Sequence, residues 1–226
     1  GFHLEIHPGL LSSRVREALA TFPAGQLHLE AGVQTFSDTG RDMVARTSAK
    51  DHEYEGLRFL CEMENLPVHV DLLAGLPGTR LQEVYSDIQR TVALAPDEIQ
   101  LEILKVLPGT PLAEQSEAYE LRPSPEPPYE VLQTKHMSEQ ELHTARQLSK
   151  ILEEYYNDKW LHPIAQRLIA GVANFLSRFH RFLAQDGNAL TTPLSLKRRF
   201  TFLHTFLDQN FSASMKERLW LETTWL

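Results

Sequence analysis

Three polar side chains near the ends of short apolar runs have the types needed to bind a small polar ligand. They are Glu5, Gln34 and Asp71. Two carboxylates and an amide suit an amine and the hydroxyl groups of a sugar. Arg46 follows Gln34 at a distance that allows a short helix between them, and a guanidinium can bind a carboxylate through two parallel hydrogen bonds. This inventory predicts a zwitterionic ligand that carries a ribose.

The apolar runs that carry these residues have the spacing of repeated strand–helix units. They span residues 2–8, 27–36, 68–78 and 99–110. A strand with its returning helix takes about 30 residues, which matches this rhythm. Because such connections are right-handed, the C-terminal ends of all the strands lie on one side, where ligands bind in such folds. We therefore predict that Glu5, Gln34 and Asp71 meet at one rim, where Gly75 and Gly78 would let backbone approach the ligand.

Helical patterns separate and follow these strands. In the first half they cover residues 10–20 and 51–63, and a capping box at Thr79–Gln82 opens a helix that runs to about residue 95. Residues 121–129 hold four prolines and exclude a regular helix or a central strand. After them we expect only helices, and these begin at Ser138, Pro163, Thr192 and Ser214. The predicted fold class is α/β.

We divide the chain into three parts on this basis. Residues 1–120 form a partial (β/α) barrel of four parallel βα units, 121–137 form a proline-rich linker, and 138–226 form an all-helical domain. The chain opens in a strand and closes on an apolar stretch. These abrupt ends predict a segment cut from a longer polypeptide, with no signal peptide.

Bulk composition excludes several classes of function. The net charge of −8 argues against a nucleic-acid partner or an anionic membrane surface. No apolar run reaches the roughly 18 residues of a spanning helix. The single cysteine, Cys61, excludes an internal disulfide and suits a reducing cytoplasm. Its helical pattern reads as that of a small buried side chain, and the ten histidines show no metal-ligand spacing.

The strand endings resemble a known family. Leu-Glu-Ile-His-Pro, Ala-Gly-Val-Gln-Thr-Phe, Val-Asp-Leu-Leu-Ala-Gly-Leu-Pro-Gly and Leu-Lys-Val-Leu-Pro-Gly-Thr-Pro are similar to the last four βα units of a radical S-adenosylmethionine barrel. The branch that is most similar combines an N-terminal cobalamin-binding domain with an uncharacterised helical C-terminal domain, and Glu-Pro-Pro-Tyr-Glu-Val-Leu at 126–132 resembles that branch.

The resemblance implies a role for each candidate residue. By similarity to the oxygen-independent coproporphyrinogen oxidases of this superfamily, Glu5 meets the methionine amine and Arg46 meets the methionine carboxylate. Gln34 and Asp71 hold the ribose hydroxyls. The adenine is bracketed by two further residues, Leu73 and the backbone near Lys105, with Gly75 counted among the cofactor-binding residues.

The resemblance also implies cofactors that this chain lacks the residues to hold. Superfamily members bind a [4Fe–4S] cluster through a Cys-x3-Cys-x2-Cys loop and reductively cleave S-adenosylmethionine to a 5′-deoxyadenosyl radical. With one cysteine, this chain is expected to hold no metal and no catalytic residue of its own. The oxidoreductase activity would belong to the parent protein. The resemblance to the cobalamin-binding branch implies methyl transfer or rearrangement with cobalamin on an unknown small-molecule substrate.

Two other readings stay open, together with an expected assembly. The helical region after residue 130 could dock a partner or the substrate, which makes the chain a non-catalytic folded fragment. Alternatively, a divergent barrel lyase or hydrolase would use Glu5 and Asp71 as acid and base, with Lys105 as a third group. Unpaired strands at the edges of a half-barrel predict a homodimer through an exposed sheet edge.

Overall fold

The computed structural model describes residues 1–43, 46 and 49–214. These residues form two compact units, Gly1–Arg146 and Gln147–Leu226. The first unit contains a parallel sheet with crossover helices, and the second is helical. Helix α6, Glu139–Ile151, begins in the first unit and ends in the second.

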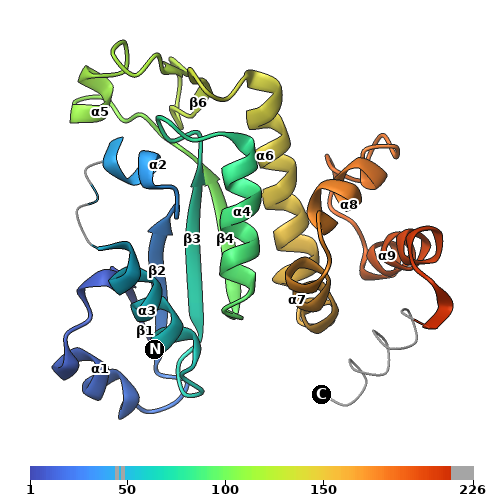
Figure 1. Cartoon of the computed structure of the whole chain (residues 1–226), viewed down its shortest axis with the longest axis horizontal. Coiled ribbons are helices and arrows are strands. Elements are labelled where there is room, and N and C mark those ends of the chain that lie inside the picture. The colour runs from blue at the N-terminus through green and yellow to red at the C-terminus, as the bar shows by residue number, and fades with distance from the viewer. Residues whose placement is uncertain (44–45, 47–48, 215–226) are drawn as a thin grey trace. The chain divides into compact units, whose positions relative to one another are not determined.

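Four strands build the sheet of the first unit (Figure 1). They are β1 (Phe2–Ile6), β2 (Leu27–Gln34), β3 (Val68–Ala74) and β4 (Glu98–Ile103). All neighbours pair in parallel, in the order β1-β2-β3-β4, which confirms the predicted α/β class and the parallel βα units. The sheet is open, with β1 and β4 at its two edges. These four strands therefore do not close into a barrel by themselves.

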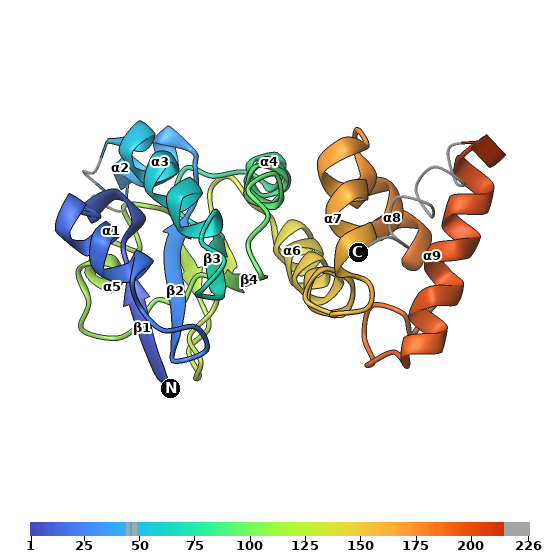
Figure 2. The same ribbon diagram turned by 90° about the horizontal axis from the view of Figure 1, so that it is seen from below.

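Short helices connect the strands. They are η1 (Pro8–Leu10), α1 (Ser13–Ala20), α2 (Asp38–Met43), α3 (Lys50–Cys61), α4 (Leu81–Val92) and α5 (Pro111–Glu114). Figure 2 shows α2, α3 and α4 on the same side of the sheet. The core of the unit lies between these helices and the sheet face that they cover.

The two faces of the sheet differ in character, because each strand alternates apolar and polar residues. In β2, β3 and β4 the covered face consists of Leu, Val, Ile and Ala side chains that are almost completely buried, such as Leu29, Val70 and Leu101. The other face carries the intervening polar side chains, which are partly buried in the central strands and exposed in β1. We call this second face the polar face. It consists of His3, Glu5, His28, Glu30, Gly32, His69, Asp71, Leu73, Gln100 and Glu102.

The start of α4 corrects the predicted cap. The N-cap is Arg80, one residue after the predicted Thr79, and the Arg80 backbone N–H donates to the Glu83 carboxylate at 2.8 Å. The Thr79 hydroxyl instead donates to the Leu76 carbonyl at 2.8 Å. The helix ends at Val92, and a left-handed residue, Ala95 (φ 55°), leads into Pro96.

The segment after α5 contains two short strands, so the expectation of helices alone is wrong there. Strands β5 (Arg122–Pro123) and β6 (Val131–Gln133) pair antiparallel. Lys105, just beyond β4, forms an isolated antiparallel bridge with Glu130. The proline-rich residues therefore belong to the first unit, where they cover the backbone that follows β4.

The second unit consists of consecutive helices. After α6 come a π-helical turn, η2 (Leu152–Tyr156), and the helices α7 (His162–Gly171), α8 (Phe175–Leu183) and α9 (Leu196–Asn210). The predicted capping box of α6 is confirmed, because Ser138 and Glu141 each accept a hydrogen bond from the other's backbone N–H. The apolar pattern from Pro163 to about residue 184 predicts a single helix, but α7 ends at Gly171, Val172 is extended, and Asn174 (φ 56°) is the N-cap of α8.

Two further helix predictions have different outcomes. The helix predicted from Thr192 begins at Leu196, with Ser195 as its N-cap. The final helix predicted from Ser214 to beyond residue 217 falls almost entirely outside the described residues. Among the residues that the structure describes, no helix has both the length and the apolar character needed to cross a membrane.

Candidate functional site

Two adjoining cavities open on the polar face, near the C-terminal ends of the strands. The first has a volume of about 510 Å³ and is lined by Glu5 and Arg46, among others. The second, of about 450 Å³, is lined by Leu73 and Lys105, among others. Both are lined by Glu30, Gln34 and Asp71. The structure thus brings the predicted site residues together around one joined space, with Glu30 as an addition.

Gly75 and Gly78, both predicted to let backbone approach the ligand, line neither of these cavities. Gly75 has a φ of 87°, a left-handed conformation that glycine adopts without strain. A Cβ built on Gly75 would lie 3.1 Å from Leu142, at the start of α6. These features describe a tight turn that packs closely on α6 at the end of β3.

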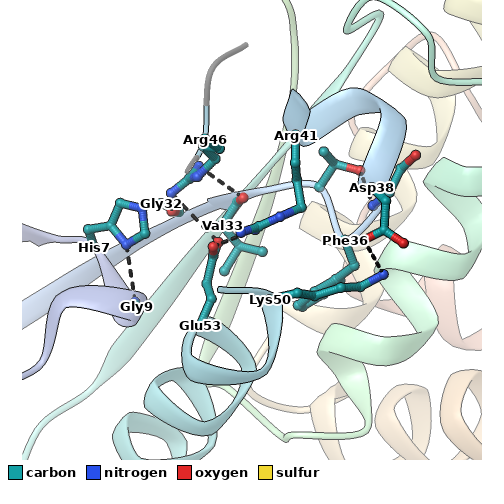
Figure 3. A network of polar contacts seen from close by, with 12 residues as sticks. His7, Gly9, Gly32, Val33, Phe36, Asp38, Arg41, Arg46, Lys50 and Glu53 are labelled. Carbon is teal, nitrogen blue, oxygen red and sulfur yellow. Dashed lines mark hydrogen bonds and ion pairs between the residues drawn. The ribbon is translucent and has the colours of Figure 1, made fainter. Parts of the chain in front are cut away.

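A buried cluster of charge forms one end of the first cavity (Figure 3). The Arg46 guanidinium donates to the carbonyl oxygens of Gly32 at 2.5 Å and Val33 at 3.0 Å. Glu53 lies between two arginines. Its carboxylate accepts a hydrogen bond from Arg41, and its other oxygen is 3.6 Å from Arg46.

Arg46 is the residue of this cluster that lines the cavity. Arg41 and Glu53 are 3% and 0% exposed, so water screens their charges little. Two guanidiniums share one carboxylate, and burial lowers the pKa of Arg46. The Nε atom of Arg46 is buried without a hydrogen-bond partner. An anionic ligand group beside Arg46 would restore the balance of charge.

Two carboxylates from neighbouring strands meet where the cavities join. Burial raises the pKa of Asp71 to about 7, and a hydrogen bond to Glu30 acts in the same direction. The pKa of Glu30 is lowered, chiefly because its carboxylate is hydrogen-bonded to His3 at 2.5 Å. Near neutral pH, Asp71 is therefore protonated for part of the time, and in that form its hydroxyl donates a hydrogen bond to the Glu30 carboxylate.

Histidines extend this ionisable surface toward the N-terminal ends of the strands. The rings of His3 and His28 stack at 5.1 Å, and His28 meets His69 edge-on at 6.2 Å. Nε2 of His69 lies 3.5 Å from the Asp71 carboxylate. Across residues 1–43, 46 and 49–214, no group of three or more His, Cys, Asp or Glu side chains is placed to hold a metal ion.

The second cavity differs from the first because one of its walls is apolar. Leu73, Ile103 and Leu104 line it, which suits the flat face of an aromatic ring. Lys105 lies at its edge and donates to Glu102 at 2.8 Å. That hydrogen bond raises the pKa of Lys105, so its amine stays protonated at neutral pH.

Glu30, Gln100 and Glu102 are cavity residues that sequence reasoning did not select. One signal was present in the sequence. In Leu-His-Leu-Glu-Ala-Gly-Val-Gln, Glu30 has the same alternation parity as Gln34, and the register places it directly beside Glu5. Alternation puts such residues on one face of a sheet, so a strand known to contribute Gln34 also contributes Glu30.

The raised pKa of Asp71 predicts a loss of stability with rising pH. Between about pH 4 and pH 7 the folded chain keeps a proton on Asp71 that the unfolded chain releases, so the free energy of unfolding falls as the pH rises. Asp71→Asn resembles the protonated form and should flatten this fall. Urea unfolding of both proteins at pH 5 and pH 8 measures the effect, and equal pH slopes would contradict it.

Three of the matches to known proteins are as follows. A family model described as "Protein of unknown function (DUF4080)" matches residues 117–223. The heme chaperone HemW of Lactococcus lactis subsp. lactis (strain IL1403) is 29% identical over 100 residues, which are 44% of this chain and 26% of HemW. The structure of coproporphyrinogen III oxidase (HemN) from Escherichia coli, titled a radical SAM enzyme, aligns with a TM-score of 0.41 and 18% identity, over 53% of this chain and 32% of HemN.

The chain spans about a quarter of the length of the curated relative that it matches. The family match covers most of the helical second unit and is to a family of unknown function.

Proposed function

We propose that the first unit binds S-adenosylmethionine in the two joined cavities, as part of a radical S-adenosylmethionine iron–sulfur protein. One observation carries the proposal. The lining changes along the joined space from the cation Arg46, through carboxylates and an amide, to an apolar wall. S-adenosylmethionine presents the matching groups in the same order, with an amino acid at one end, a ribose in the middle and adenine at the other end.

Each predicted site residue that lines the cavities has a role in this proposal. Arg46 binds the methionine carboxylate, and Glu5 binds the amine. Gln34 and Asp71 hold the ribose hydroxyls. The adenine lies against the apolar wall that includes Leu73, beside the backbone near Lys105.

The chain's own residues do not fit the iron–sulfur cluster that the superfamily uses. Cluster ligation requires thiolates, and Cys61 is the sole cysteine. It ends α3 and lines neither cavity, and burial raises the pKa of its thiol to about 12. We therefore propose that this chain binds S-adenosylmethionine without cleaving it. None of the three matches reported above names a cobalamin-binding protein, so cobalamin is not included in the proposal.

The test is equilibrium binding of S-adenosylmethionine by isothermal titration calorimetry. Hydrogen bonds to charged groups contribute about 1.5–3 kcal/mol, so Arg46→Met and Asp71→Ala should each weaken binding roughly 10- to 100-fold. Glu98→Gln is the matched control, because Glu98 begins β4 and lines neither cavity. Far-ultraviolet circular dichroism confirms that each variant is folded.

Binding of a second ligand, adenosine, tests which end of the site holds the amino acid of S-adenosylmethionine. Adenosine lacks the amino acid, so Arg46→Met should leave its affinity unchanged, whereas Asp71→Ala should weaken it. No measurable binding of S-adenosylmethionine to the folded wild-type chain would contradict the proposal. Equal loss of both ligands in Arg46→Met would contradict the assigned orientation.

The raised pKa of Asp71 also favours a second candidate function, a lyase or hydrolase with Asp71 and Glu5 as acid and base. Lys105, the third group that this reaction would need, is less well suited to act as a nucleophile. A lysine nucleophile requires a lowered pKa, and the pKa of Lys105 is raised by Glu102. Absence of binding in the calorimetric experiment would direct attention to this alternative.

A further inference from the structure

One side of α4 holds the residues that directly follow β2. The Asp87 carboxylate accepts hydrogen bonds from the Thr35 hydroxyl at 2.6 Å and from the Phe36 backbone N–H at 3.1 Å. One turn earlier in the helix, Glu83 accepts a hydrogen bond from the Ser37 hydroxyl at 2.5 Å. Residues four apart lie on the same side of a helix, so the two carboxylates act on one short segment of backbone.

The hydrogen bonds of Asp87 are buried. Thr35, Phe36 and Asp87 are 1%, 2% and 5% exposed. Burial raises the pKa of Asp87 to about 6, and the hydrogen bonds from Thr35 and Phe36 act in the opposite direction. The carboxylate is therefore ionised at pH 8, and each of its oxygens accepts one hydrogen bond from the segment. Because a buried charge is costly without such partners, this contact fixes the positions of Thr35 and Phe36.

The backbone that this contact fixes begins directly after the strained residue Gln34. The Thr35 backbone N–H donates to the Val33 carbonyl at 2.9 Å, which closes a turn centred on Gln34. With a φ of 70° at its centre, the turn belongs to the rare class of γ-turns in which the central residue is strained. On the preceding side, Arg46 donates to the Gly32 and Val33 carbonyls (Figure 3). The turn is thus held from both sides.

The turn determines where the Gln34 amide lies. Gln34 lines both cavities, whereas Asp87 lines neither. A Cβ built on Gly32 would lie 2.9 Å from Nε2 of Gln34, so the amide lies directly over Gly32. A relaxed backbone at Gln34 would change the direction of its Cα–Cβ bond and would move the amide away from this place.

We propose that Asp87 is a positioning residue that holds the strained turn at Gln34 and thereby directs the Gln34 amide toward the cavities. Asp87 acts through the hydroxyl of Thr35 and the backbone of Phe36, without contact with a ligand. The hold on the turn is a property of the fold, whereas its effect on S-adenosylmethionine rests on the function proposed above.

Unfolding in urea at pH 8 tests the hold on the turn without any ligand. Gln34→Gly should raise the urea midpoint of the wild type, because glycine adopts a positive φ without strain. In an Asp87→Asn background the released turn relaxes, so Gln34→Gly should lose most of this gain. The effect of glycine on the unfolded chain is the same in both backgrounds and cancels in this double-mutant cycle. Equal gains in both backgrounds would overturn the proposal.

Calorimetric titration with S-adenosylmethionine tests the effect on the site. Loss of one neutral hydrogen bond weakens binding roughly 3- to 10-fold, which is the loss expected for Asp87→Asn. In a Gln34→Ala background the same substitution should have no further effect, since the amide is already absent. A purely structural role would weaken binding equally in both backgrounds, and that outcome would overturn the proposal. Absence of binding by the wild type would contradict the proposed function, and the unfolding cycle would still decide the role of Asp87.

Matched variants decide the question if Asp87→Asn does not fold. Thr35→Val removes the hydroxyl that donates to Asp87 and should reproduce the loss of binding, whereas Thr35→Ser keeps the hydroxyl and should bind like the wild type. Equal weakening by these two variants would overturn the proposal. Asp97→Asn is the control, because Asp97 also accepts a backbone N–H, from Val68 at 2.8 Å, but at the opposite end of β3 from the cavities. It should leave binding unchanged.

Discussion

Replacing Glu53 by glutamine is expected to lower the free energy of unfolding by about 3–5 kcal/mol, the range for breaking a buried ion pair. Glu53 is completely buried, accepts a hydrogen bond from Arg41 and lies 3.6 Å from Arg46. Glutamine keeps the size of the side chain but removes the charge. Two buried guanidiniums would then lack their shared carboxylate. Urea unfolding monitored by circular dichroism gives the value.

Glu55→Gln is the control for this measurement. Glu55 lies on the same helix, its side chain is 54% exposed, and it pairs with Arg58 at the surface. Exposed ion pairs contribute about 0–1 kcal/mol, so this change should have little effect. Glu53→Gln should also weaken binding of S-adenosylmethionine, because Glu53 helps to hold Arg46 at the cavity. A Glu53→Gln protein as stable as the control would show that the cluster does not support the fold.

Replacing Gly56 by alanine should destabilise the chain by about 3 kcal/mol, at the upper end of the usual cost of overpacking. A Cβ on Gly56 would lie 1.9 Å from the Pro8 carbonyl oxygen and 2.7 Å from its carbon. These are backbone atoms of η1, so the clash requires the whole turn to move. Helix propensity alone predicts the opposite sign, because alanine is favoured over glycine by about 1 kcal/mol. Thermal and urea unfolding measure the outcome.

Gly171→Ala separates packing from propensity. Gly171 ends α7, and a Cβ there would have no atom within 4 Å, so this variant should be unchanged or slightly more stable. Gly56→Ala should also weaken ligand binding, because Ile6 and His7 of the first cavity directly precede η1. A Gly56→Ala protein with wild-type stability would mean that α3 and η1 do not pack as closely as described.

The strands and the gathering of Glu5, Gln34, Arg46 and Asp71 could be predicted from sequence for a physical reason. Apolar runs at βα spacing dictate parallel strands, and parallel strands direct their C-terminal ends to one side. Polar residues near those ends must then approach one another. Their roles toward a ligand stay predictions, since proximity alone does not identify what they bind.

Glu30 was not predicted as a site residue, because alternation does not distinguish a face that meets water from a face that lines a cavity. A polar residue at every second position marks the face opposite the core, whether that face meets water or lines a cavity. Only the register, with Glu30 between Glu5 and His69, shows that the side chains form a continuous surface. For the same reason, the sequence does not distinguish Gln100 and Glu102 from ordinary solvent-facing residues of β4.

Helix boundaries were the other weak point. At α4, Thr79 and Arg80 both precede a residue able to complete a capping box, and the local sequence does not say which one leaves the helix. Between α7 and α8, the pattern of apolar residues continues, although α7 ends at Gly171, Val172 is extended, and Asn174 with its left-handed backbone is the N-cap of α8. Asparagine adopts the left-handed conformation at low cost, but its presence in a sequence does not by itself predict that conformation.

Gln34 has a φ of 70°, at a register irregularity of β2 beside Gly32. Glycine would adopt this conformation without the roughly 1–2 kcal/mol that an ordinary side chain costs there. Gln34 thus adopts a strained backbone conformation at a position where glycine would not be strained. Strained residues of this kind are concentrated at binding and active sites, and we propose that Gln34 is kept at this position for the contacts of its amide with a ligand.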